Sequence, residues 1–302
     1  MTQITANNVT LEYENEGARD APAMLLIMGF GAQLTLWPDD MVAALVGHGF
    51  RVIRYDNRDV GLSQKFTGQT PPGAVKQTLA RKLRLDRVGL MPKVPYTLRD
   101  LADDAIGLLD ALEIDVAHIV GASMGGMIAQ HVAAHYPERC LSLTTIFSTT
   151  GNPALPQAKR EALAALVKRP ESTDEAALVE HGIYLSRTIG SPGFPAPEEH
   201  LRERSRAAIR RSFYPEGPTR HLAAILDDGD RRALIKDIRV PTLVLHGEDD
   251  PLVPVEGGRD IAATIPGAKL KTIPGWGHDL PAELLEEVTG AIADHAHVNK
   301  PL

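Results

Sequence analysis

The chain has 302 residues, of which 43% are hydrophobic and 24% charged, a balance typical of a globular protein and unlike that of a disordered or fibrous chain. Its formal net charge is −7. An acidic balance disfavours a phosphate backbone as partner, so we expect no nucleic-acid binding. The single cysteine, Cys140, cannot form an internal disulfide, so the chain needs no oxidising compartment.

Targeting and membrane segments are not evident in the sequence. The N-terminal residues lack a basic segment followed by an apolar stretch, and no apolar run approaches the ~20 residues that cross a bilayer. We therefore expect a soluble, cytoplasmic protein with no membrane span. A monomer or a homodimer is expected.

The first 120 residues alternate short apolar runs with helical patterns, which predicts a mostly parallel sheet with crossover helices. Continuous apolar runs indicate buried strands, and Thr97 with Asp100 forms a capping-box pattern at the start of a helix. Residues 63–96 form either a loop with a short helix around 74–85 or a second piece of a lid. Strands are predicted at residues 9–13, 23–28, 50–55, 116–120 and 141–147, and helices at 38–47, 97–112 and 127–135.

The pattern changes between residues 152 and 230. Strand patterns vanish there, and helical segments rich in Ala, Leu, Arg and Glu are broken by prolines, which predicts an inserted helical cap. Strands resume at 240–245 and 270–273, followed by a closing helix at 281–293, with His295 and His297 in a frayed polar tail. We therefore assign residues 1–151 and 231–302 to an α/β core domain and residues 152–230 to the cap.

A nucleophile pattern follows the strand predicted at residues 116–120. Gly121-Ala122-Ser123-Met124-Gly125 fits G-x-S-x-G between a strand and a helix, the context in which a sharp turn lifts a serine hydroxyl out of the sheet. The positions two before and two after the serine must be small because the backbone is crowded there. The pattern predicts Ser123 as a nucleophile.

A serine nucleophile needs a base, and the base needs an orienting group. His278 stands in a loop after a predicted strand and before the last helix. Asp249 and Asp250 lie at the carboxyl end of the strand predicted at 240–245. The order serine, aspartate, histidine differs from that of the chymotrypsin and subtilisin classes, so the three elements predict a triad of Ser123, His278 and one of the two aspartates.

Four further segments carry a resemblance: MGFG at 28–31, WP at 37–38, DNRDVGLS at 56–63 and GHDLP at 277–281. With the nucleophile pattern, they resemble the α/β-hydrolase fold superfamily over nearly the whole chain, and within it the branch that contains aclacinomycin methylesterases and related bacterial serine esterases. Two positions depart from the commonest pattern. Met28 stands where many members carry histidine, and Asp59 where many carry glycine.

The resemblance implies roles for further residues. In similar sequences the acid follows the glycine that ends the strand by three positions, which here favours Asp250 over Asp249. The backbone N–H groups of Met124 and Phe30 are implied as an oxyanion hole. Because ester pockets are mostly apolar, four apolar cap residues are candidates for lining the pocket: Ile183, Phe194, Phe213 and Leu222.

The resemblance also implies an activity: a cofactor-independent serine hydrolase that cleaves a carboxylic ester of a small or medium organic molecule, such as a methyl ester of a polyketide or a lactone. Lactonases, C–C bond hydrolases and cofactor-free haloperoxidases share the triad, and a small-molecule receptor that retains it is an alternative of another class. No cofactor and no metal are expected, since His131 and His135 have the spacing of a zinc-binding helix but lack the glutamate after the first histidine.

Overall fold

The computed structural model of the protein describes residues 2–83, 85, 89–168 and 170–299. Its centre is a sheet with the strand order β1-β2-β4-β3-β5-β6-β7-β8. Strand β2 is antiparallel to β1 and β4, and the remaining neighbours pair in parallel. The strands are β1 (Thr2–Ala6), β2 (Val9–Glu16), β3 (Ala23–Ile27), β4 (Arg51–Tyr55), β5 (Ala117–Ala122), β6 (Cys140–Ile146), β7 (Thr242–Gly247) and β8 (Lys269–Ile273).

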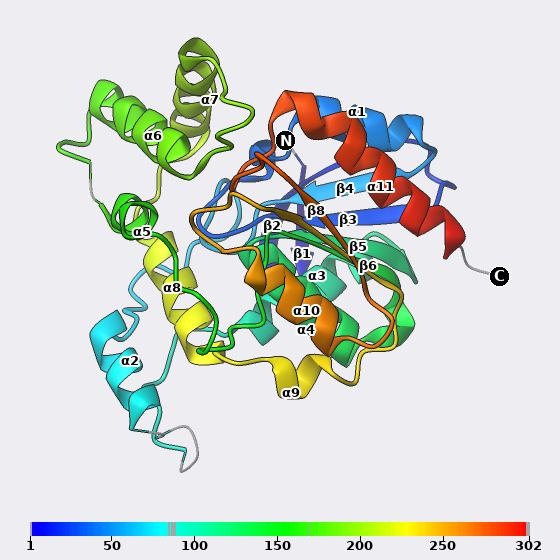
Figure 1. Cartoon of the computed structure of the whole chain (residues 1–302), viewed down its shortest axis with the longest axis horizontal. Helices are drawn as coiled ribbons and strands as arrows, with labels where there is room; N and C mark the ends of the chain where they lie inside the picture. The colour runs from blue at the N-terminus through cyan, green and yellow to red at the C-terminus, as the bar shows by residue number, and fades with distance from the viewer. Residues whose placement is uncertain (1, 84, 86–88, 169, 300–302) are drawn as a thin grey trace.

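Helices cover both faces of the sheet (Figure 1). On one face α1 (Asp39–Gly47) packs beside α11 (Leu285–Val298), and on the other α3 (Leu98–Ala111) packs beside α4 (Met124–His135), with α10 (Glu256–Thr264) and α9 (Arg232–Ile235) next to them. A parallel sheet covered on both faces needs continuous apolar strands. Accordingly, every residue of β3, β4, β5 and β7 is buried. Short 3-10 turns occupy Leu34–Leu36, Pro137–Arg139 and Ala282–Leu284.

Residues 152–230, called the helical insertion below, lie between β6 and the α9 turn that precedes β7. Among their described residues no strand occurs, and the helices are α5 (Arg160–Val167), α6 (Glu175–Ile189), α7 (Glu198–Arg211) and α8 (Gly217–Asp228). Figure 1 shows α5, α6 and α7 gathered to one side of the sheet. Among the described residues, no helix is long and apolar enough to cross a bilayer.

Helix α2 (Ala74–Lys82) belongs with the helical insertion in space, although it lies far from it in sequence. It packs on α8, and the Gln77 Nε2 group donates to the Ala223 carbonyl at 2.9 Å. The segment 63–96, left open by the sequence, thus carries a helix that contacts the insertion. Position 84, within the helix expected around 74–85, lies outside the described residues.

Two elements differ from expectation. Strand β1 was not predicted; it pairs with β2 through a turn at Asn7 and Asn8, whose φ angles are 48° and 60°, the left-handed conformation of two-residue hairpins. The prediction of a frayed tail is wrong, because α11 continues to Val298. The tail is ordered because His295 Nε2 lies 3.2 Å from the Pro241 carbonyl and the His297 ring stacks on Phe50 with centroids 4.8 Å apart.

Candidate active site

Ser123 sits on a strained turn between β5 and α4. Its φ and ψ angles are 57° and −120°, a region that costs energy for any residue with a side chain. The glycines on either side make the turn possible: a Cβ at Gly121 would fall 2.2 Å from the Gly125 carbonyl oxygen, and one at Gly125 would fall 1.9 Å from the Ile27 carbonyl oxygen. The turn leaves Ser123 half-buried at the carboxyl end of the sheet.

His278 joins Ser123 to Asp250. Its Nε2 lies 3.0 Å from the Ser123 Oγ, and its Nδ1 lies 2.7 Å from the Asp250 Oδ2. The other carboxylate oxygen of Asp250 accepts the backbone N–H groups of Leu252 and Val253, each at 2.8 Å. A carboxylate held this way keeps the proton of the imidazole on Nδ1, so that Nε2 presents its lone pair to the hydroxyl.

The neighbouring carboxylate, Asp249, points elsewhere. Its Oδ2 accepts the backbone N–H of Gly275 at 2.7 Å, so it braces the loop that carries His278. A second histidine, His246, lies 3.8 Å from the Asp250 Oδ2 and donates Nε2–H to the Val253 carbonyl at 2.8 Å. Burial lowers the pKa of His246, which keeps it neutral beside the carboxylate.

Sequence reasoning missed the groups that orient the His278 ring. The ring packs against Phe147, with ring centroids 4.6 Å apart, and the His278 backbone N–H donates to the Ile189 carbonyl at 2.8 Å. The Ser191 Oγ accepts the Gly277 N–H at 2.9 Å. Phe147 directly follows β6 and has a positive φ of 36°, a conformation that a sequence pattern does not reveal. The helical insertion therefore supports the His278 loop directly.

The loop after β3, residues 29–34, passes beside the serine. A Cβ on Gly29 would lie 3.0 Å from the Ser123 Cβ and 3.5 Å from the Met124 backbone nitrogen. Met124 is the first residue of α4, where backbone N–H groups have no partner within the helix. No described residue accepts a hydrogen bond from the Phe30 or the Met124 N–H. Among the described residues, both predicted donors are thus without a protein acceptor, and their role as the oxyanion hole stays a prediction.

The loop 29–34 is fastened to the helical insertion. The Gln33 Nε2 group donates to the carbonyls of Ala208 and Ser212, at 2.8 and 2.9 Å, and so caps the end of α7. The Arg211 guanidinium donates to the Gln33 Oε1 at 2.8 Å and pairs with the fully buried Asp56 at 2.7 Å. No local sequence pattern indicates these contacts, because the partners lie more than 150 residues apart.

The four apolar candidates from the helical insertion do not share one environment. Ile183 packs inside the insertion, against Val179 of its own helix and Leu201 of α7, because the α6–α7 contact needs an apolar core of its own. Phe194 packs at the edge of the core near Gly275. Phe213 is 45% exposed, and Leu222 is half-buried. Their role as pocket lining stays a prediction.

His131 and His135 stack with ring centroids 5.6 Å apart. The His131 Nε2 lies 2.7 Å from the Asp228 Oδ1 of α8, and Arg231 pairs with the same carboxylate. Burial works to raise the pKa of Asp228, but the hydrogen bonds and charges of His131 and Arg231 hold it below its ordinary value. His131 therefore links α4 to α8 through Asp228.

Comparison with known proteins decides the family. The family described as alpha/beta hydrolase fold matches residues 22–283. The chain belongs to the α/β-hydrolase fold family. The predicted fold class is confirmed.

Particular relatives narrow the similarity. The chain is 31% identical to rhodomycin D methylesterase of Streptomyces sp. strain C5, over 97% of this chain and 96% of the relative, which confirms the resemblance to the methylesterase branch. It is 28% identical to 3-oxoadipate enol-lactonase 2 of Acinetobacter baylyi, over 89% and 87% of the two chains. The crystal structure of the enol-lactonase from Burkholderia xenovorans superposes with a TM-score of 0.72 at 26% identity, covering 98% of this chain and 100% of that one.

Proposed function

We propose that this α/β hydrolase is a serine esterase that cleaves a carboxylic ester through an acyl-enzyme. The observation that carries the proposal is the bridge made by His278, with Nε2 at 3.0 Å from the Ser123 Oγ and Nδ1 at 2.7 Å from the Asp250 Oδ2. The similarity to methylesterases supports the same conclusion. Ser123, His278 and Asp250 form the triad in this proposal.

In the first half-reaction the Ser123 Oγ attacks the ester carbonyl carbon while the His278 Nε2 takes the hydroxyl proton. The tetrahedral adduct collapses, the bond to the alcohol oxygen breaks, and the same proton passes from Nε2 to the departing alcohol. Asp250 stabilises the imidazolium that exists between these steps. Two backbone N–H groups, of Met124 and Phe30, stabilise the oxyanion without any reorganisation.

Water completes the cycle. The His278 Nε2 takes a proton from a water molecule, whose oxygen attacks the acyl carbon and displaces the Ser123 Oγ. The proton returns to the serine, and the carboxylic acid leaves. The chain's own residues supply every group in both half-reactions, so we propose no cofactor.

We propose the helical insertion, residues 152–230, as a lid over this site, with the substrate between lid and sheet. Its contacts with the loop 29–34 and with the His278 loop support that role. A small or medium organic ester fits the similarity to rhodomycin D methylesterase. A lactone is a second candidate, favoured by the enol-lactonase relatives, since a lactone is a cyclic ester that the same steps would open.

The test is turnover by the whole chain on p-nitrophenyl acetate and butyrate, methyl esters of bulky acids, and lactones. Ser123→Ala should lower kcat roughly a million-fold, because the hydroxyl is the nucleophile. A serine-directed organophosphate should label the wild type at Ser123 and leave the variant unlabelled. Equal rates for wild type and variant on a good ester would rule out the proposal. Ligand binding without Ser123-dependent turnover would favour the receptor alternative.

A further inference from the structure

A buried histidine of the helical insertion holds the loop 29–34 from above. His221, on α8, is fully buried. Its Nδ1 accepts the backbone N–H of Gly31 at 3.2 Å, and its Nε2 faces the Arg58 carbonyl at 2.9 Å. One ring therefore connects the loop that follows β3 with the loop that follows β4.

These two partners fix the protonation of the ring. A backbone N–H only donates, so the His221 Nδ1 must carry a lone pair toward Gly31. The Arg58 carbonyl only accepts, so Nε2 must carry the proton. Burial lowers the pKa of His221 to about 4, against the attraction of Asp59 and with the repulsion of Arg220 and Arg58. The ring is therefore neutral and locked in one tautomer near neutral pH.

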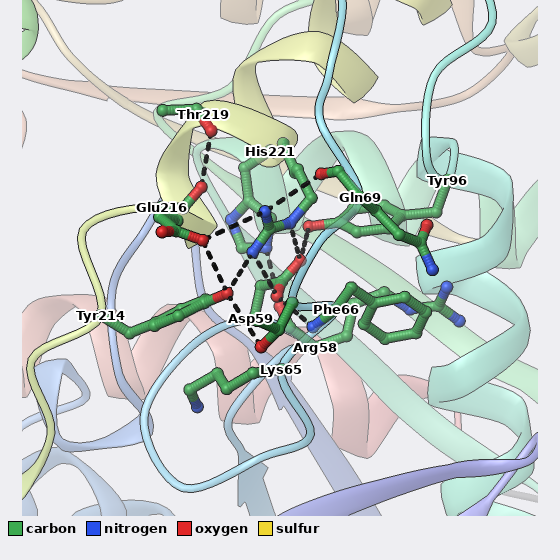
Figure 2. A network of polar contacts seen from close by, with 12 residues as sticks. Arg58, Asp59, Lys65, Phe66, Gln69, Tyr96, Tyr214, Glu216, Thr219 and His221 are labelled. Atoms are coloured by element: carbon green, nitrogen blue, oxygen red, sulfur yellow. Dashed lines mark hydrogen bonds and ion pairs between the residues drawn. The ribbon is translucent and has the colours of Figure 1, made fainter.

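A buried ion pair fixes the position of α8 one residue before His221. The Arg220 Nε and Nη2 groups donate to the two oxygens of Asp59, at 2.7 and 2.9 Å. The Asp59 carboxylate also accepts the Tyr96 hydroxyl at 2.6 Å and the Phe66 N–H at 2.7 Å (Figure 2). Each oxygen of the Asp59 carboxylate therefore accepts two hydrogen bonds. The side chains of Arg220 and Asp59 are both at most 3% exposed.

The backbone of α8 lies close against this loop. A Cβ at Gly217, in the first turn of α8, would fall 2.1 Å from the Asp59 carbonyl oxygen. Asp59 itself has a φ of +68°, the left-handed region that favours glycine. The bonds of its carboxylate to Arg220, Tyr96 and Phe66 stabilise this conformation.

The peptide that His221 holds belongs to a tight turn. The Ala32 N–H reaches the Gly29 carbonyl at 3.3 Å, and Gly31 has a φ of +63°. In such turns the central peptide, here between Phe30 and Gly31, can lie in either of two orientations that differ by a flip. The bond from the Gly31 N–H to His221, at 3.2 Å, holds this peptide in the observed orientation and ties the turn to α8. The Phe30 N–H, the proposed oxyanion donor, belongs to the preceding peptide of the same turn, so its direction depends on where the turn as a whole is held.

We propose that His221 is a positioning residue of the oxyanion hole: by accepting the Gly31 N–H, it holds the turn that aims the Phe30 N–H at the oxyanion. This inference rests on the proposed function. Under this proposal, stabilisation of the transition state also requires that the Arg220–Asp59 ion pair hold α8 in place. His221 itself contacts no reacting atom, so its loss should act on kcat and leave substrate binding nearly unchanged.

Two substitutions separate the two nitrogens of His221. In His221→Gln the side-chain amide reaches the Arg58 carbonyl and provides no acceptor to Gly31, whereas in His221→Asn the Oδ1 falls near the former Nδ1 and still accepts. With p-nitrophenyl acetate, His221→Gln should lower kcat about 100-fold, the cost of a misplacement of about 1 Å, with KM nearly unchanged. His221→Asn should stay within about tenfold of wild type, since one neutral hydrogen bond is lost.

The matched control is His118→Gln. His118 is also buried, and burial likewise lowers its pKa to about 4. It lies at the opposite end of β5 from Ser123, where its Nδ1 contacts the Ser142 hydroxyl of β6. This variant should change thermal stability without changing kcat. A general loss of stability therefore cannot imitate the expected result.

A transition-state probe separates positioning from packing. Phenylboronic acid binds a serine oxygen as a tetrahedral adduct, so its Ki should rise in His221→Gln by the same factor by which kcat falls. In the wild type, nitrogen NMR of the His221 ring should show Nδ1 unprotonated and Nε2 protonated between pH 5 and 8, a measurement that needs no folded variant. A protonated Nδ1, or a folded His221→Gln with wild-type kcat and Ki, would overturn the inference and leave the esterase proposal intact. No Ser123-dependent turnover in the wild type would overturn both.

Discussion

His278 is half-buried and His221 is fully buried, and their ring nitrogens have different kinds of partners. Around His278 both partners are side chains, the Ser123 hydroxyl and the Asp250 carboxylate. Around His221 both are backbone groups, the Gly31 N–H and the Arg58 carbonyl. The hydroxyl gives up its proton and the carboxylate stabilises the imidazolium that results, whereas a peptide group does neither near neutral pH. The comparison separates a histidine placed for chemistry from one placed for geometry.

The strongest test of the catalytic role of His278 is to replace the carboxylate of Asp250. Asp250→Asn preserves shape but favours the wrong tautomer of His278, and kcat should fall about 10,000-fold, as in the serine-protease case. Asp249→Asn removes only the charge of the acceptor for the Gly275 N–H, and should cost about tenfold or less, at most the effect of one lost hydrogen bond. The measurement is kcat for both variants on p-nitrophenyl acetate. If Asp249→Asn shows the larger loss, the acid is assigned to the wrong residue.

The structural surroundings of His221 are best tested at the Arg220–Asp59 ion pair beside it. Arg220→Met leaves the Asp59 carboxylate buried without its countercharge and should lower the free energy of unfolding by about 3–5 kcal/mol. The measurement is urea unfolding. Arg19→Met is the control, because its ion pair with Glu113 is exposed on both sides, and it should leave the midpoint where it is.

A double variant distinguishes lost charge from lost packing. Asp59→Asn combined with Arg220→Met removes both charges, so part of the stability lost in Arg220→Met should return. Equal stability of the single and double variants would mean that the contact between α8 and the loop after β4 depends on shape and not on the ion pair.

The strands and the nucleophile turn could be predicted from sequence because their causes are local. Residues 23–28 form one apolar run, and β3 spans Ala23–Ile27. The glycine at 121 is required by the Gly125 carbonyl oxygen of the turn itself. The same locality explains why Thr97 and Asp100 form the predicted capping box of α3. Patterns within about five residues report such causes directly.

The supports of the site could not be predicted, because they join distant segments. Asp59 and Arg220 are 161 positions apart, and Arg58 and His221 are 163 apart. The one local signal was Asp59, noted in the sequence as a departure from the commonest pattern, and that departure alone did not indicate a partner. Only the packing of α8 against the loop after β4 supplies that partner.

The smallest expected effect concerns acid stability, and it tests whether the buried histidines are neutral. The pKa of His221 and that of His118 both lie at about 4, below the ordinary value of 6.5, because burial disfavours the charged ring. Between pH 6.5 and 4 the unfolded chain therefore binds protons that the folded chain does not, so stability falls as the pH is lowered through this window and levels off below it.

His118→Gln isolates one of the two rings, since it removes a titrating group without touching the loop 29–34. The free energy of unfolding, measured in urea at pH 7 and pH 5, should fall less between these pH values in His118→Gln than in the wild type. The carboxylates titrate equally in both proteins and cancel in the difference. An unchanged difference would mean that His118 gains its proton in the folded protein as readily as in the unfolded one, and that burial alone does not keep a histidine neutral in this fold; the neutrality of His221 would then depend on its two backbone partners.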